Sequence, residues 1–366
     1  MENRIKEQLG IVEVLTSELA KLKEENISLE ADFLHVSKAV EQSFRVIKEL
    51  MLQVSKLEEE SNRLLAIGRV AFVRTNNAKY EILDPNFALS QSFYPKFYTI
   101  EETLFQIISE KKSLARFGDG EFAIITNERN IGYQKLDDML RVRLKEVLKS
   151  KHPNLLIAIA NNYGNLDKYT DDAADGIRDY MNEQTRKQHR ELLDIERKYH
   201  DTYTTRPYVC YRDNCTDAPK KRFDKLKEVW KDRNVIIVEG AQTRIGVRND
   251  LLSGAAQVRR ILAPATNSFD RYDALLNASL DFAKQNTLFL VALGPSAEVL
   301  VYDLTLKGFQ AVDIGHADME YEWFLAGKGK RTSVPYKYNY EVYGGDQVED
   351  LKDSVYESQI IARFEL

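Results

Sequence analysis

The sequence is poor in the residues that make disulfide frameworks and zinc sites. Only two of its 366 residues are cysteines, Cys210 and Cys215, and five are histidines. Two cysteines form no disulfide framework, and no second pair of ligands at zinc spacing lies near them. Five histidines leave no set for a histidine-rich metal cage. The low number of cysteines predicts a reducing compartment, so we expect the protein in the cytoplasm.

Long apolar runs are also missing. The longest, such as residues 288–293, have the length of a strand, whereas a helix needs about 20 apolar residues to span a bilayer. The chain starts with the charged residues Glu2 and Arg4 and has no apolar signal-peptide core there. We therefore expect no integral membrane segment, although a partner could hold the protein at the inner face of the membrane.

An excess of one charge and several ligand-binding fingerprints are absent as well. With 52 basic and 57 acidic residues, the net charge of −5 gives no general attraction to nucleic acid. The chain has neither the Gly-x-Gly-x-x-Gly of dinucleotide sites nor the Gly-x-x-x-x-Gly-Lys-Ser/Thr of a P-loop. Without a Gly-x-Ser-x-Gly elbow, a serine hydrolase triad has no support.

What the N-terminal residues do carry is a heptad repeat of apolar side chains. Up to about residue 65 the chain has no proline and only one glycine, Gly10. With Ile5 at position a, 14 of the 18 a and d positions over nine heptads are apolar. Such a seam stays on one side of a helix only when the helix supercoils against a partner. We expect a coiled-coil oligomerisation helix over residues 1–66 and a linker over residues 67–98.

The side chains at these positions favour a parallel homodimer. Valine and isoleucine prevail at a, leucine prevails at d, and Asn26 occupies an a position, which is the pattern of two-stranded parallel coiled coils. Phe33 at another a position is bulky, which leaves trimers and tetramers open. An antiparallel pair, and a helix folded back on its own globular domain, also remain open.

From about residue 99 the pattern changes to alternating strands and helices. Apolar runs of buried-strand type alternate with helix-length segments, which indicates a parallel sheet covered on both faces. We predict an α/β fold over residues 99–345, a mostly parallel sheet with helices on both faces, and a helical tail over residues 346–366. Strands are expected at residues 113–118, 155–160, 235–240, 260–264, 288–294 and 310–315, and helices at segments that include 222–232, 247–257, 270–285 and 295–307.

A segment rich in charge and tyrosine interrupts this alternation. Residues 163–222 predict a largely helical insertion followed by a loop. In an enzyme that acts on sugars such rings could stack on an acceptor; alternatively they pack a small helical lid. The tyrosines are Tyr163, Tyr169, Tyr180, Tyr199, Tyr203, Tyr208 and Tyr211.

Asp119-Gly120-Glu121 follows the first of these predicted strands. In parallel sheets ligands bind at the carboxyl ends of strands, and two carboxylates one residue apart can both reach a hard divalent cation. Asp-x-Glu also occurs at residues 194–196 and 318–320, so the pattern alone is weak. Only Asp119 follows an apolar strand with glycine on both sides, so Asp119 and Glu121 are candidate ligands of Mn²⁺ or Mg²⁺, and a solvated turn is the alternative.

Three more polar clusters stand at predicted strand ends, in residues 239–250, 293–297 and 313–323. In the first, Arg244 can grip a phosphate, aided by amides of a following helix. In the second, Ser296 could cap a helix. The small residues beside it would allow a nucleotide to approach closely. In the third, His316 could bind metal, contact phosphate or act as a base. Each cluster also has a plainly structural interpretation: a surface arginine loop, a helix cap, or a structural histidine.

Together these four segments resemble the bacterial glycosyltransferases of the GT-D fold type. The resemblance covers roughly residues 90–340 and rests on the order and spacing of segments 116–121, 238–251, 293–297 and 313–322. It implies a Rossmann-like domain that takes a sugar from a nucleotide diphosphate sugar, typically a UDP-sugar. The family's acceptors are glycans of bacterial surface proteins or polysaccharides, and its Asp-x-Glu motif, here Asp119 and Glu121, binds Mn²⁺ or Mg²⁺. Arg248 stands where family members often have glycine, so this loop is expected to differ.

The remaining site residues are predicted on the same basis. If transfer inverts the anomeric centre, a base takes the acceptor proton, and Glu239, His316 and Asp318 are unranked candidates. Two alternatives stay open: a metal-dependent phosphatase or nucleotide hydrolase, and a non-catalytic dimeric scaffold that binds glycan. The residues expected to contact the donor are Arg116, Gly118, Gly120, Thr243, Arg244, Asn249, Gly294 and Ser296.

Overall fold

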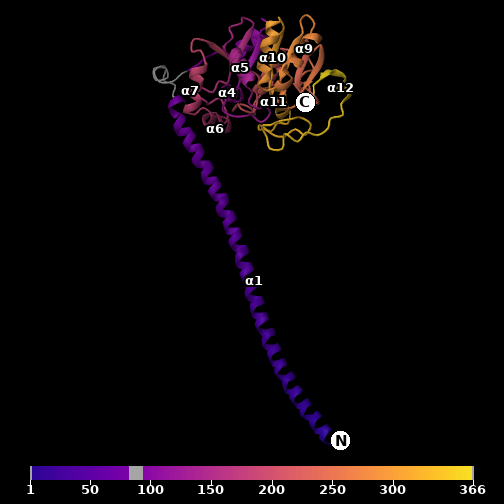
Figure 1. The fold of residues 1–366 in the computed structure, drawn as a ribbon. Helices are drawn as coiled ribbons and strands as arrows, with labels where there is room; N and C mark the ends of the chain where they lie inside the picture. The colour runs from indigo at the N-terminus through magenta and orange to yellow at the C-terminus, as the bar shows by residue number, and fades with distance from the viewer. Residues whose placement is uncertain (1, 82–93, 365–366) are drawn as a thin grey trace. The chain divides into compact units, whose positions relative to one another are not determined.

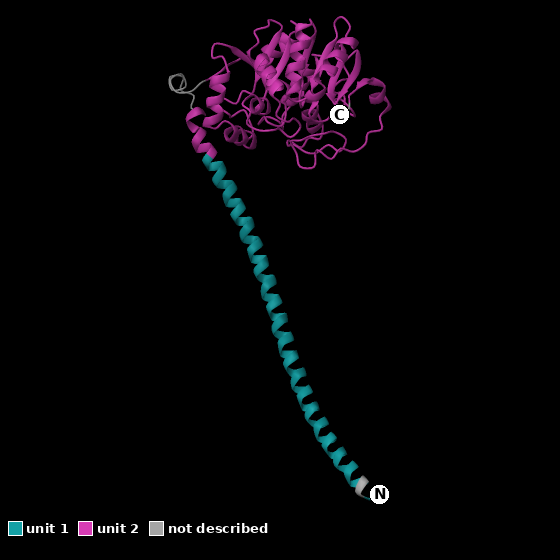
Figure 2. Ribbon diagram, in the orientation of Figure 1, with its two compact units in different colours: residues 1–72 teal, residues 73–366 magenta. Residues whose placement is uncertain are grey.

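The computed structural model describes residues 2–81 and 94–364. The chain divides into two compact units, residues 1–72 and residues 73–366 (Figure 2). Among the described residues no helix is both long and apolar enough to cross a membrane.

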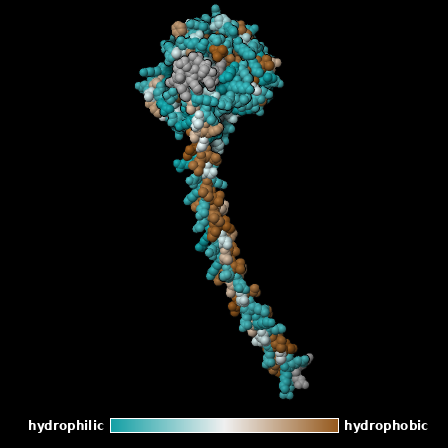
Figure 3. Space-filling model, turned by 90° about the vertical axis from the view of Figure 1, so that its left-hand side faces the viewer, coloured by the Kyte–Doolittle hydropathy of each residue, from teal (hydrophilic) through white to brown (hydrophobic). Residues whose placement is uncertain are grey.

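The first unit is formed by one helix, α1 (Glu2–Glu81), whose last turns belong to the second unit. The seam side chains are exposed in the single chain, Leu22 by 61% and Leu29 by 66%. Figure 3 shows apolar side chains gathered along this helix. The predicted linker is wrong over residues 67–81, which continue the helix because they contain no proline and a single glycine, Gly68. Residues 82–93 of that linker lie outside the described residues.

The second unit is built on a nine-stranded sheet in the order β1-β4-β3-β2-β8-β7-β5-β6-β9, and every pairing between neighbouring strands is parallel. The predicted α/β class and parallel sheet are thus confirmed. The strands are β1 (Lys96–Phe97), β2 (Ser113–Phe117), β3 (Leu155–Ile159), β4 (Lys198–Asp201), β5 (Asn234–Gly240), β6 (Gln257–Ala263), β7 (Leu288–Ala292), β8 (Gln310–Asp313) and β9 (Ile360–Arg363).

Helices cover this sheet (Figure 1). The central helix, α10, packs across β2, β7 and β8, with α5 and α9 beside it. The helices are α3 (Ile100–Ile108), α4 (Asp119–Ile125), α5 (Asp138–Lys149), α6 (Asp171–Tyr180), α7 (Glu183–Leu192), α8 (Ala218–Lys227), α9 (Tyr272–Phe282), α10 (Ser296–Leu306), α11 (Ala317–Leu325) and α12 (Ser354–Gln359), with 3₁₀ turns η1 (Thr202–Thr205) and η2 (Ser268–Arg271).

Three segments differ from the sequence prediction. The segment 163–222 holds helices α6, α7 and α8, but also β4, which joins the sheet beside β3. The predicted helix at 247–257 is wrong: positive φ angles at Arg244, Gly246 and Arg248 (53°, 71° and 61°) give turns in place of a helix. The tail at 346–366 holds only the short α12 before β9 pairs with β6, so it is not simply helical.

The order of the strands fixes where a ligand can bind. From β2 the chain adds β3 and β4 on one side, whereas β8 pairs with the other side of β2. The strand order therefore reverses between β2 and β8. Open parallel sheets bind ligands at the carboxyl ends of the strands at such a switch point, and the Asp119 and His316 segments follow these two strands.

The last turns of α1 are held against α6 within the second unit. Arg74 makes two hydrogen bonds of 2.8 and 2.7 Å to Asp175. Arg178 makes two of 2.7 and 2.8 Å to Glu81, and its carbonyl accepts one of 2.9 Å from Asn77. Val73 and Asn77 are buried there. Residues 73–81 are therefore an integral part of the α/β unit.

Candidate functional site

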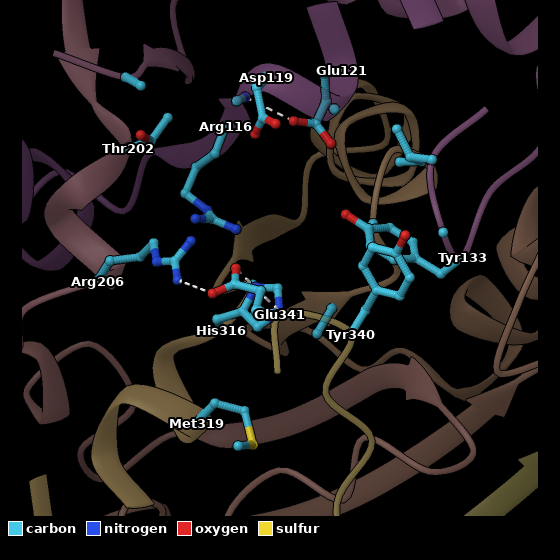
Figure 4. Close-up of a pocket in the computed structure, with 18 of the residues that line it drawn as sticks. Arg116, Asp119, Glu121, Tyr133, Thr202, Arg206, His316, Met319, Tyr340 and Glu341 are labelled. Carbon is cyan, nitrogen blue, oxygen red and sulfur yellow. Dashed lines mark hydrogen bonds and ion pairs between the residues drawn. The ribbon is translucent and has the colours of Figure 1, made fainter. Parts of the chain in front are cut away.

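A cavity of about 850 Å³ lies at the carboxyl ends of the central strands (Figure 4). Its walls come from the ends of β2, β5, β7 and β8, from α4 and α6, and from the segment that follows α11. The predicted site residues that line it are Arg116, Gly118, Asp119, Gly120, Glu121, Thr243, Gly294, His316 and Asp318.

The two carboxylates of the Asp-x-Glu motif have different surroundings. Both lie in the first turn of α4, directly after β2. The Asp119 side chain is 65% exposed and 3.6 Å from Arg129. Glu121 is buried, and its Oε2 accepts a 2.7 Å hydrogen bond from the Gly118 amide. Burial raises the pKa of Glu121 to about 7, against the opposing effect of that amide.

Two further carboxylates that the sequence analysis left without a role lie beside Glu121. Glu298, in α10, is buried, and its Oε2 has no hydrogen-bond partner. Burial and the charges of Glu121 and Asp313 raise its pKa well above the ordinary value. Asp313, at the end of β8, accepts a 2.9 Å bond from Arg116 Nη2. The signal for Glu298 was its place two residues after Ser296, in the first turn after a strand-end motif.

This end of the cavity fits a hard divalent cation. It holds more carboxylates than cations, and Glu298 Oε2 is buried without a partner. Among the described residues no three acidic, histidine or cysteine side chains already converge as a metal cage. An ion held by Asp119 and Glu121 would thus take its other ligands from phosphate oxygens and water, as Mg²⁺ commonly does.

The opposite wall carries basic side chains around one carboxylate. Glu341 Oε2 lies 2.7 Å from Arg206 Nη2 and 3.3 Å from Arg331 Nε, and Glu341 Oε1 lies 3.8 Å from His316 Nε2. Figure 4 shows Arg116 pointing into the same space from the other side. Arg206, Arg331 and Glu341 have no sequence signal as site residues, because they come from segments far from the strand-end motifs.

A pair of tyrosines forms a third side of the cavity. The rings of Tyr133 and Tyr340 lie edge to face with centroids 6.1 Å apart (Figure 4). Tyr133 packs on Gly294, whose φ is +54° and where a Cβ atom would lie 2.3 Å from the ring. Gly294 therefore admits an aromatic side chain of the protein where a close nucleotide was predicted.

The tyrosines of residues 163–222 mostly pack inside the protein. Only Tyr180 and Tyr203 of the seven line the cavity. Tyr163, Tyr169, Tyr199, Tyr208 and Tyr211 are buried. Packing, and not stacking on a ligand, therefore accounts for most of these rings.

The three candidate bases stand in different positions. Glu239 is fully buried, bonded at 2.5 Å to Arg260 and at 2.7 Å to the Ile245 amide, and does not reach the cavity. Asp318 borders the cavity, but its oxygens accept bonds from Lys337 (2.6 Å), Asn249 and the Gly246 amide. His316 lines the cavity and is only partly buried. Burial lowers its pKa, against the charge of Glu341.

Three predicted donor contacts lie away from the cavity. Arg244 Nη1 donates to the Tyr336 and Glu349 carbonyls, both at 2.8 Å, because its left-handed backbone turns the side chain toward the C-terminal segment. Asn249 bonds to Asp318 and Glu322. Ser296 is buried and accepts a 3.0 Å bond from Ser268. The structure gives these side chains roles in holding loops and not in lining the cavity.

Comparison with known proteins agrees with this architecture. Residues 114–342 match the family model of the glycosyltransferase GT-D fold. The chain is 36% identical over 269 residues to a probable glycosyl transferase Gly of Streptococcus gordonii, and 34% identical over 265 residues to glycosyltransferase GlyD of Streptococcus pneumoniae serotype 4. Each match covers 72% of this chain but only 38% and 32% of those proteins, so the chain spans about a third of the length of these relatives.

Solved structures match over nearly their whole length. One, of domain of unknown function 1792 and described as having a distinct glycosyltransferase fold, has a TM-score of 0.69 and 35% identity over 74% of this chain and 95% of its own. Another, a glycosyltransferase from Streptococcus sanguinis, has a TM-score of 0.68 and 33% identity, covering 74% of this chain and 99% of its own. The chain therefore belongs to the glycosyltransferases of the GT-D fold.

Proposed function

We propose that this protein transfers a sugar from a nucleotide diphosphate sugar to an acceptor hydroxyl in a metal-dependent reaction. The observation that carries the proposal is the cluster of Asp119, Glu121 and Glu298 in a cavity at the switch point of the sheet. A UDP-sugar as donor and a bacterial surface glycan or glycoprotein glycan as acceptor follow from the family resemblance. The cytoplasm remains the predicted compartment.

The acidic end is proposed to hold Mn²⁺ or Mg²⁺ through Asp119 and Glu121. When bound, the metal would offset the charge that develops on the departing nucleoside diphosphate. Arg116 would add a second cation at a fixed place, because Asp313 binds it through both the carboxylate (2.9 Å) and the carbonyl (3.0 Å). Donors fixed before the reaction stabilise developing charge most effectively.

His316 is the proposed base among the three candidates. It faces the cavity, and its lowered pKa keeps the ring neutral near pH 7, where it can accept a proton. Glu239 and Asp318 are engaged by Arg260 and Lys337, respectively. In this assignment Asp318 is a positioning residue for the Gly246 loop.

The test is a panel of sugar nucleotides, with release of nucleoside diphosphate measured in Mn²⁺, in Mg²⁺ and in EDTA. The proposal expects release with one donor class, dependent on metal and increased by an acceptor. Asp119→Ala and Glu121→Ala should each lower the rate by roughly 100-fold or more. Full activity of both variants would refute the assignment. Release of inorganic phosphate would favour a hydrolase, and binding of glycan without turnover would favour a scaffold.

The helix of the first unit is proposed to join two copies of the chain in a parallel coiled coil. Its exposed leucines, such as Leu15, Leu22, Leu29, Leu50 and Leu57, are each more than half exposed in the single chain and share the d positions of one seam. A seam of this length is stable when a partner covers it.

A further inference from the structure

We propose that Arg206, Arg331 and His316 form a phosphate subsite that the chain's own Glu341 carboxylate occupies until substrate phosphate replaces it. The inference deepens the proposed function and rests on it for the identity of the substrate, a nucleoside diphosphate. In this inference the Glu341 carboxylate competes with the donor phosphate for the subsite.

The geometry around Glu341 is that of a bound anion. The two guanidinium groups of Arg206 and Arg331 meet the same oxygen, Oε2, at 2.7 and 3.3 Å, and His316 faces the other oxygen at 3.8 Å. Burial alone would raise the pKa of this carboxyl group, but the charges of Arg206 and Arg331 hold it below the ordinary range. Glu341 is therefore ionised whenever the protein is folded near neutral pH.

Arg206 does not need Glu341 to stay in place. Its Nε lies 3.4 Å from Glu320, which is fully buried. Glu320 Oε2 is itself fixed by 3.0 Å hydrogen bonds from the Tyr208 and Val209 amides. Glu320 therefore gives Arg206 a second, fully buried counter-charge, which remains when a ligand replaces the shorter bond to Glu341.

Glu341 comes from an irregular segment whose neighbouring residues are tied to the fold: the Tyr338 amide donates a 2.9 Å bond to the Gln242 carbonyl, and the Tyr340 ring packs on Tyr133. Between α11 and α12 the chain forms no named helix or strand, only an isolated bridge between Val334 and Lys337. Lys337 anchors it through bonds of 2.6 and 2.8 Å to acidic side chains of α11. Two residues after Glu341, the side chain of Tyr343 is fully exposed. The Glu341 carboxylate can therefore leave the subsite without disturbing the anchor.

Phosphate is a better ligand than carboxylate for this set of donors. It carries more negative charge and more acceptor oxygens, and guanidinium groups bind it through paired hydrogen bonds. The subsite lies across the cavity from Asp119, and Arg116 points toward it (Figure 4). A phosphate seated there would have Arg116 and the acidic end of the cavity on its other side.

The test compares binding of inorganic pyrophosphate and of UDP, each with Mn²⁺, to the full chain by titration calorimetry. Glu341→Gln removes the competing charge and should bind both probes about tenfold more tightly. Arg331→Gln should bind them about tenfold more weakly. Glu349→Gln, an exposed position of the same segment outside the cavity lining, is the matched control and should leave both affinities unchanged.

Weaker or unchanged binding in Glu341→Gln would overturn the inference, since Glu341 would then support the subsite. Absence of pyrophosphate binding to every form would overturn it too. Tighter pyrophosphate binding in Glu341→Gln, together with no binding of UDP or other nucleoside diphosphates, would uphold the phosphate subsite and refute the proposed function.

Discussion

Glu239 lies near the end of the apolar strand β5 and Asp119 comes directly after β2, yet their surroundings differ. Glu239 is fully buried against Arg260, whereas the Asp119 side chain is 65% exposed at the cavity. A buried carboxylate with a fixed cation holds the fold, because removing one partner leaves the other charged and unpaired. An exposed carboxylate at a strand end can exchange water for a ligand.

Replacing Glu239 should therefore affect stability and not chemistry. Glu239→Gln is expected to lower the free energy of unfolding by about 3 kcal/mol, because Arg260 stays buried without its counter-charge. Urea denaturation measures this, with Asp119→Asn as a control that should stay within about 0.5 kcal/mol of wild type. Turnover of folded Glu239→Gln should be near normal; normal stability with lost turnover would instead make Glu239 the base.

His200 is a buried histidine that makes stability depend on pH. Its Nδ1 lies 2.9 Å from Thr103 Oγ1, and burial, with the charge of Arg197, lowers its pKa to about 4. Between about pH 4 and the unfolded value near 6.5 the unfolded chain binds more protons, so stability is lost as pH falls through this range. The loss from this group is at most about 3 kcal/mol.

The check is unfolding of wild type and His200→Gln at pH 7 and pH 4.5. Wild type should lose more stability than the variant over this interval, because only wild type has the His200 ring to protonate. His189, whose pKa is also lowered to about 4, stays present in both proteins and cancels in the comparison. An equal loss in both would show that His200 titrates normally.

At the scale of elements, regular patterns were predictable and irregular backbone was not. The heptad repeat predicted α1, and apolar runs predicted β2, β3, β5, β7 and β8. β4 was missed because Lys198-Tyr199-His200-Asp201 is short and polar, and it becomes a strand by pairing with β3 and β1. Gly246 is a residue type that favours a positive φ angle, but nothing signals the positive φ angles of Arg244 and Arg248, so a helix was wrongly predicted after Gly246.

The same contrast between regular and irregular segments applies to the site residues. Strand-end residues such as Arg116, Asp119, Glu121 and His316 were predictable, since a parallel sheet brings its carboxyl ends together. Glu298 had one signal, its place in the first turn after the strand-end residue Ser296, whereas the Arg206–Glu341 pair had none, because it joins segments 135 residues apart. Long-range placement of loops depends on tertiary packing that no local pattern records.

The seam of α1 makes a prediction about assembly. Leu22→Glu combined with Leu50→Glu puts charges at two d positions and should convert a dimer of the full chain to monomers, because buried unpaired charge opposes pairing. Leu52→Glu, at an f position outside the seam, should leave the dimer intact. Sedimentation velocity separates these states. A monomeric wild type at tens of micromolar, or identical behaviour of all forms, would contradict the coiled-coil proposal.

At the scale of the whole molecule, the family match and the heptad helix occupy different parts of the chain. The match covers residues 114–342, and the seam ends near residue 64. Residues 73–81 lie between these regions and hold α6, which contributes Ala173 and Tyr180 to the cavity wall. In our proposal, assembly and sugar transfer therefore belong to different parts of the chain.

The most direct test of the central claim is the thermal shift caused by UDP with and without Mn²⁺, in wild type and in Asp119→Asn combined with Glu121→Gln. A ligand that binds only the folded state raises the melting temperature. We predict a rise of about 2–5 °C for wild type with UDP and Mn²⁺ together, and almost none in EDTA or in the double variant. An equal shift in EDTA, or an undiminished shift in the double variant, would contradict a metal-dependent nucleotide site at Asp119 and Glu121.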